Sequence, residues 1–92
     1  MEKKLSQFTF TLQVFREDKV FVAYNPELDV SSCGESVEEA KENLRDAVSG
    51  FLKSAHKHGT LHSILEEAGY VRKRNRWHAP ELMALDRFSV PA

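Results

Sequence analysis

The sequence predicts an α+β fold with the element order β-β-β-α-α-β. Two observations predict it. Apolar and polar residues alternate near the start of the chain, which is typical of strands with one buried face. A longer segment then has apolar residues at spacings of three and four, which is typical of a helix packed on a sheet. We therefore expect a three- to four-stranded, mostly antiparallel sheet with the helices on one face.

Three strands are expected before the first helix. Over residues 8–15 the even positions are apolar and the odd ones polar, until Phe15 breaks the alternation. A short polar connection leads to Val20–Tyr24, which is β-branched and aromatic, so the two runs predict an antiparallel hairpin. Pro26 cannot donate to a strand ladder and should end the second strand. A weaker third strand is expected over residues 28–33.

Two helices are expected next. Ser36 and Glu39 form a predicted capping box, in which the serine hydroxyl accepts from the amide of Glu39 and the glutamate reaches back to the amide of Ser36. The long helix that starts there should end at Gly59, and Thr60 should begin a short helix that ends at Gly69. The apolar stripe of the long helix consists of Val37, Ala40, Leu44, Ala47, Val48, Phe51, Leu52 and Ala55.

The remainder of the chain is less regular. Pro80 interrupts it, and residues 85–90 are apolar enough for a short terminal strand. We expect one domain over residues 1–92, with its core at about 7–69 and a tail at 70–92. Gly50 lies inside the long helix, where glycine costs about 1 kcal/mol relative to alanine, so its presence predicts a close approach by the sheet or another helix.

The composition is that of an ordinary globular protein. Of the 92 residues, 41% are hydrophobic and 29% charged, and no apolar run nears the roughly 18 residues that span a bilayer, so we expect a cytoplasmic protein. The single cysteine, Cys33, excludes an internal disulfide and a cysteine zinc cage. Charge is uneven, with seven acidic and two basic residues between Glu27 and Asp46 and four cations within 72–76.

Three motifs are more specific. They are Val22-Ala23-Tyr24-Asn25-Pro26-Glu27-Leu28 at a strand end, Gly34-Glu35-Ser36-Val37-Glu38-Glu39-Ala40 at the helix start, and Asn43-Leu44-x-x-Ala47 in the helix. In this order they resemble the HicB-like antitoxin family, over about the first two-thirds of the chain. The resemblance implies a reduced ribonuclease-H-like fold and an antitoxin that binds HicA, a small mRNA-cleaving toxin, and covers its catalytic histidine. Many members add a carboxy-terminal DNA-binding domain, which we do not expect here because only 23 residues follow Gly69.

The resemblance implies a protein-binding surface in the acidic strand-to-helix region. The residues expected to contact a partner are Tyr24, Glu27, Asp29, Glu35 and Glu38. Catalysis is not expected, because metal-dependent hydrolysis of nucleic acid needs converging carboxylates and neither 8–15 nor 20–24 contains one. We expect no cofactor and no metal: His56, His58 and His62 lie close in sequence, but the first two do not share a helical face.

Other functions stay open. A second surface mixes cations with an aromatic residue, which suits phosphate contact and base stacking: Arg72, Lys73, Arg74, Arg76 and Trp77. The same run suits an exposed strand edge that resists aggregation, or an interface with an acidic patch. The alternatives to an antitoxin are thus a stand-alone nucleic-acid-binding regulator and a solitary oligomeric module without a toxin.

A homo-oligomer is also expected. A thin sheet with helices on one side leaves its other face uncovered, and such a face can form a dimer interface. The residues predicted on it are Phe21, Ala23, Thr9, Thr11 and Phe15.

Overall fold

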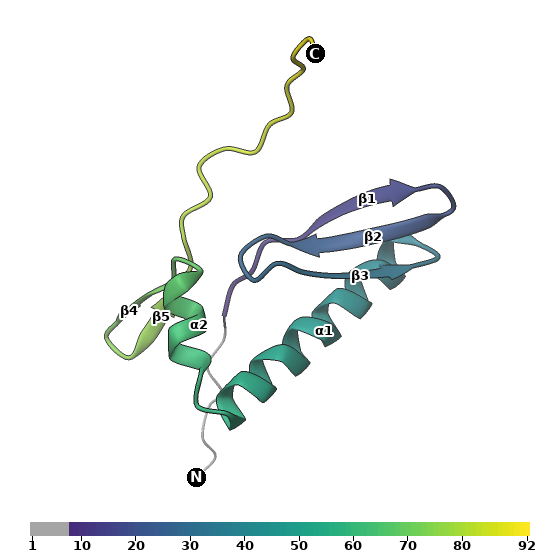
Figure 1. Ribbon diagram of the computed structural model, residues 1–92. Helices are drawn as coiled ribbons and strands as arrows, with labels where there is room; N and C mark the ends of the chain where they lie inside the picture. Colours follow the sequence, from purple (N-terminus) through teal and green to yellow (C-terminus); the bar gives the residue numbers. More distant parts are fainter. Residues whose placement is uncertain (1–7) are drawn as a thin grey trace.

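The computed structural model describes residues 8–92, so Met1 to Gln7, with which the predicted domain begins, lie outside the described residues. The elements are β1 (Gln13–Glu17), β2 (Val20–Asn25), β3 (Val30–Gly34), α1 (Val37–Lys57), α2 (Leu61–Glu67), β4 (Val71–Lys73) and β5 (Arg76–His78). The first three strands form an antiparallel sheet in the order β1-β2-β3, and α1 lies along one face of it (Figure 1). The predicted α+β class is confirmed.

The end of the chain differs from the expected terminal strand. Residues 85–90, which are all described, form no strand, and the last two strands, β4 and β5, pair with each other in a separate hairpin beside α2 (Figure 1). Arg74 and Asn75 connect them with φ angles of 53° and 63°. Positive φ at both central residues is the geometry of a type I′ turn. Beyond this hairpin, residues 79–92 form an arm without helix or strand, which leaves the hairpin and projects from the body at its end (Figure 1).

The core lies between the sheet and α1. Its buried members are Ala23, Ala40, Leu44 and Val48. Partly buried apolar side chains surround them: Phe10, Leu12, Val14, Phe21, Leu28, Val30 and Leu52. The apolar stripe predicted for the long helix thus supplies three of the four buried residues, and Ala23 of β2 and Ala40 of α1, both fully buried, allow the helix to approach the sheet closely.

The predicted orientation of the sheet was wrong. Phe21 and Ala23, expected on the uncovered face, belong to the core against α1. Since side chains alternate along a strand, Val20, Val22 and Tyr24 lie on the other face. Of the further residues expected there, Phe15 does lie on that face, because it is paired with Val22 across β1 and β2.

Gly34, at the end of β3, and Gly50, inside α1, have different surroundings. A Cβ on Gly34 would lie 2.6 Å from the backbone nitrogen of Ala40, so the chain needs glycine where β3 turns into α1. A Cβ on Gly50 would meet no described atom within 4 Å, so the predicted close approach at Gly50 was wrong for this part of the chain. Gly59 and Gly69 follow the two helices with φ of 74° and 95°, as expected for residues that end helices. No helix of the described residues combines the length and the hydropathy required to cross a bilayer.

Candidate protein-binding surface

The turn between β2 and β3 is held by a buried polar network. Asn25 is fully buried, and its Nδ2 donates to the Thr11 carbonyl at 2.8 Å and to Glu27 Oε1 at 2.6 Å. Its Oδ1 accepts from the Leu28 amide at 2.9 Å. Glu27 also accepts from the Thr11 amide at 2.8 Å and from the Thr11 hydroxyl at 2.5 Å. The Glu27 carboxylate therefore holds the segment before β1 to this turn, and is engaged within the protein itself.

Tyr70 fixes the same segment from the other side. It is buried after α2, its hydroxyl donates to the Thr9 carbonyl, and its ring centroid lies 5.5 Å from that of Phe10. Burial raises the pKa of Tyr70 above its ordinary value, and the negative charge of Glu27 raises it further. The hydroxyl is thus kept in the protonated form that donates this hydrogen bond.

Tyr24 and Asp29 form an exposed pair. The Tyr24 hydroxyl donates to Asp29 Oδ1 at 2.9 Å, and this hydrogen bond is the main reason that the pKa of Tyr24 is raised. Asp29 has a φ of 57°, a left-handed conformation that aspartate tolerates better than most residues do. The pair presents a carboxylate and an aromatic ring to solvent, which are suitable groups for contact with a cationic partner.

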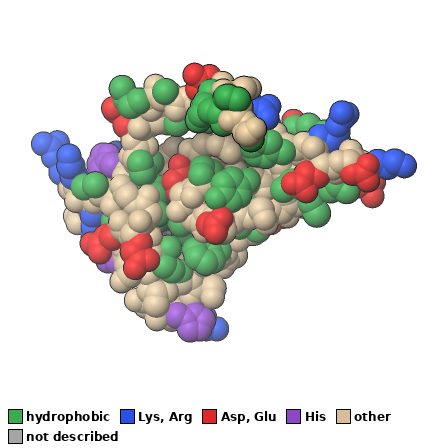
Figure 2. Space-filling view, turned by 45° about the horizontal axis from the view of Figure 1, so that its top comes forward, with side chains coloured by type: hydrophobic (Ala, Val, Ile, Leu, Met, Phe, Trp, Pro, Cys, Tyr) green, Lys and Arg blue, Asp and Glu red, His purple; other side chains and the backbone are tan. Residues whose placement is uncertain are grey.

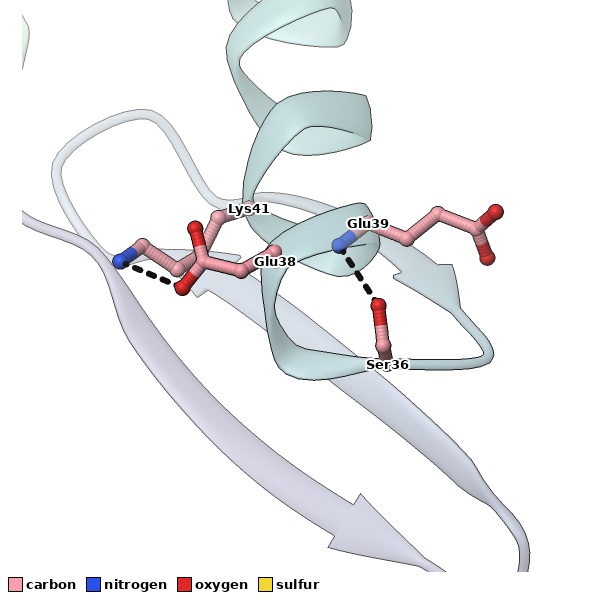
Figure 3. Close-up of polar contacts among 4 residues, drawn as sticks. All are labelled: Ser36, Glu38, Glu39 and Lys41. Atoms are coloured by element: carbon pink, nitrogen blue, oxygen red, sulfur yellow. Dashed lines mark hydrogen bonds and ion pairs between the residues drawn. The ribbon is translucent and has the colours of Figure 1, made fainter.

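The start of α1 presents a second acidic group (Figure 3). Ser36 Oγ accepts from the Glu39 amide at 3.0 Å, which confirms the predicted cap. Glu39 Oε1, however, accepts from the Glu35 amide at 2.6 Å instead of the Ser36 amide, so the reciprocal bond of the box is displaced by one residue. Glu38 reaches Lys41 at 3.5 Å but its side chain is 77% exposed. The carboxylates of Glu35 and Glu38 are therefore available to a partner.

The five residues predicted to bind a partner form two groups. Tyr24, Glu27 and Asp29 lie at the β2–β3 turn, whereas Glu35 and Glu38 follow the opposite end of β3. At about 3.3 Å per residue, the six steps from Asp29 to Glu35 span roughly 20 Å. The single acidic patch expected from the sequence is thus divided along the length of β3, and only the second group adjoins the start of α1.

The basic run forms the β4–β5 hairpin. Arg72 lies opposite Trp77 and Lys73 opposite Arg76, with Arg74 in the connecting turn. All four cations are exposed, and Lys and Arg side chains gather with histidines at one end of the molecule (left in Figure 2). Trp77 is half-buried because its ring packs edge-on against His62, with 5.3 Å between centroids. This contact anchors a two-stranded hairpin that would be marginal by itself.

The histidines do not form a site in the described part of the chain. His58 Nδ1 lies 2.8 Å from the Ser54 carbonyl, and His62 packs on Trp77. Among residues 8–92, no group of three His, Cys, Asp or Glu side chains is placed to hold a metal ion.

Sequence reasoning missed Asn25, Thr11 and Tyr70, which organise the turn. Asparagine before proline favours a turn and can accept from a following amide, so Asn25-Pro26 carried a local signal. The contacts to Thr11 and Thr9 had no local sequence signal, because they join segments that are distant in sequence. No family model, no curated protein and no solved structure matches this chain.

Proposed function

We propose that this protein is a non-enzymatic, HicB-like antitoxin that binds and neutralises a small mRNA-cleaving toxin of the HicA type. The motifs behind the resemblance fall on consecutive elements, namely β2, its turn, β3 and the start of α1. The observation that carries the proposal is the exposed acidic corner at Glu35 and Glu38. A toxin that cleaves RNA needs cations to hold phosphates, and an acidic surface of a partner can occupy those cations.

The residues have different parts in this proposal. Glu35 and Glu38 contact the toxin directly. Tyr24 and Asp29 supply a second, separate contact, because their hydrogen-bonded pair is exposed. Glu27 acts indirectly, since its carboxylate accepts three hydrogen bonds that hold the turn in place.

The first experiment is co-expression with the neighbouring reading frame, with an affinity tag on this chain only. A short basic protein that co-purifies, and that arrests growth when expressed alone, is the expected result. A neighbour that neither binds nor inhibits growth would refute the antitoxin proposal and favour a solitary module.

Paired substitutions then locate the contact. The variant Glu35→Gln/Glu38→Gln keeps side-chain shape and removes two charges, and Asp29→Asn does the same at the other group. Glu66→Gln/Glu67→Gln on α2 is the matched control, because both residues are exposed and the charge change is the same. We expect Glu35→Gln/Glu38→Gln to weaken toxin binding about tenfold or more at low salt and the control to leave it unchanged. Equal weakening by the control would mean that net charge, not this corner, determines binding.

A second candidate function is nucleic-acid binding by the β4–β5 hairpin. The type I′ turn favours it, because it holds Lys73, Arg74 and Arg76 together on an exposed tip. Fluorescence anisotropy with single-stranded RNA and duplex DNA, over a range of salt concentrations, tests it. Alanine at positions 72, 73, 74 and 76 should abolish a salt-dependent signal, whereas alanine at the equally exposed positions 16, 19, 53 and 57 should reduce it less. Equal loss in both variants would indicate binding without a defined site.

A further inference from the structure

The arm at residues 79–92 is apolar although nearly all of its side chains are exposed. It contains five of the ten large apolar residues that are exposed in the described chain: Leu82, Met83, Leu85, Phe88 and Val90. Met83 is 80% exposed and Phe88 84%. Only Glu81, Asp86 and Arg87 in the arm are charged. Segments that stay solvated are poor in such residues and rich in charge, so this composition favours burial against another surface.

The sheet has a surface of matching character. The face away from α1, here called the open face, carries Phe15, Val20, Val22, Tyr24 and Cys33, which the strand register places together, and the polar Gln13, Glu17 and Ser31 lie on the same face. Phe15 is 46% exposed and Val20 40%. Among the described residues no element covers this face, and no strand pairs with the outer edge of β1. An apolar face beside a free strand edge is a surface that extended chain can cover.

The arm does not cover the open face of its own molecule. A hollow separates residues 85–87 of the arm from residues 13–15 of β1, which line its two sides. Figure 2 shows apolar side chains along the projecting arm at the top of the view and others on the body beneath it. The arm therefore lies next to β1 without packing on it, and its apolar residues remain exposed.

We propose that two copies of this chain form a dimer by exchanging arms, with each arm lying across the open face and along the free edge of β1 of the other copy. Each chain carries both the arm and the open face, so a two-fold symmetric dimer forms two identical arm-to-face contacts. Five large apolar side chains carry on the order of 300 to 600 Å². Two arms and the two faces that they cover then reach the roughly 1,200 to 2,000 Å² of a specific interface.

The dimer does not depend on the proposed toxin. Glu35 precedes α1 and Glu38 lies in its first turn, outside the open face, so arm exchange leaves these two carboxylates accessible, whereas it covers Tyr24 of the second contact. Loss of toxin binding in Glu35→Gln/Glu38→Gln and loss of the dimer are thus separately measurable.

Sedimentation equilibrium of the full chain tests the proposal. The wild type should have twice the 10.5 kDa mass of one chain. Leu85→Ser/Phe88→Ser should raise the dimer dissociation constant by on the order of 100-fold, because it removes two anchors from each arm. Glu81→Ser/Arg87→Ser, in the same arm, is the control and should remain dimeric. A monomeric wild type, or a dimer that is unaffected by Leu85→Ser/Phe88→Ser, would overturn the proposal.

Disulfide trapping distinguishes exchange from other arrangements, because Cys33 is the only cysteine and lies on the open face. One chain carries Cys33→Ser together with a new cysteine at position 85, 88 or 90, and is mixed with the wild-type chain. At least one of the three positions should give a mixed cross-linked dimer after oxidation. A second set of variants keeps Cys33 and carries the new cysteine at position 85, 88 or 90 in the same chain. Disulfide bonds that form only within single chains would show that the arm folds back on its own sheet, and would overturn exchange.

Discussion

Replacing Asn25 by alanine should destabilise the protein more than any change at the exposed acids. The side chain is fully buried and takes part in three hydrogen bonds, to the Thr11 carbonyl, the Glu27 carboxylate and the Leu28 amide. Alanine would remove one hydrogen-bond partner from each of these three groups. A buried group that is left unpaired and out of reach of water lowers the unfolding free energy by about 1 to 3 kcal/mol. Because water reaches some of this site, we expect a total loss of about 2 to 4 kcal/mol.

Urea unfolding at neutral pH, followed by circular dichroism, measures this loss as a lower transition midpoint with an unchanged slope. Glu38→Ala is the control, since that side chain is 77% exposed and paired only with Lys41. The unfolding free energy of this variant should change by less than about 0.5 kcal/mol, including the small effect of removing a negative charge from the start of the helix. Asn25→Asp is a second probe, because it keeps the acceptor for Leu28 but places a carboxylate beside Glu27. If both Asn25 variants unfolded within 0.5 kcal/mol of the wild type, the network would not hold the turn.

Three further outcomes follow from the same contacts. Gly34→Ala should lower the unfolding free energy by about 1 to 3 kcal/mol, because its Cβ would lie 2.6 Å from the Ala40 nitrogen; an unchanged urea midpoint would contradict this. Gly50→Ala should raise it by about 0.5 to 1 kcal/mol, as alanine is the better helix former and no described atom obstructs it. A loss of stability would mean that position 50 contacts something. The raised pKa of Tyr70 means that the folded state holds this proton more tightly than the unfolded state. The contribution of Tyr70 to the unfolding free energy should be complete below the unfolded pKa of about 10 and should be lost as pH rises through the folded pKa. A Tyr70→Phe variant should show a smaller decline in midpoint, because Tyr24, whose pKa is also raised, still contributes.

Local signals predicted most of the fold. The cap at Ser36 and most of the stripe of α1 depend on residues three or four apart, so the sequence alone was sufficient for them; Val37 and Phe51 of the predicted stripe are exposed and do not join the core. The choice of sheet face was not local, because Val20, Phe21, Val22 and Ala23 are all apolar and alternation does not say which pair faces inward. The small size of Ala23, which allows close approach by α1, was the relevant signal.

The prediction for residues 71–92 was wrong for a related reason. The hairpin at β4 and β5 turns through Arg74-Asn75, whereas the pair that identifies a type I′ turn in sequence is Asn-Gly. The apolar residues at 85–90 then suggested a strand, although they lie in the arm. Apolar character alone does not distinguish a segment that pairs as a strand in its own sheet from a segment that forms no strand.

The candidate site was predicted in composition but not in arrangement. Glu35 and Glu38 are exposed as expected, but Asp29 lies at the far end of β3, and Glu27 is bonded to Thr11. Proximity along the sequence overstated proximity in space, since an extended strand separates its ends by its full length.

The contacts of residues 9–11 also bear on the order in which the protein folds. The Thr9 carbonyl accepts a hydrogen bond from Tyr70, which is 61 positions later, and the Thr11 hydroxyl donates one to Glu27, which is 16 positions later. Neither hydrogen bond can form before these later residues are in place. The β2–β3 hairpin and α1, by contrast, close over short loops, and short loops form fastest. During synthesis residues 9–11 are therefore fixed later than the β2–β3 hairpin and α1, and their amide hydrogens should exchange earlier than those of β2 whenever α2 opens.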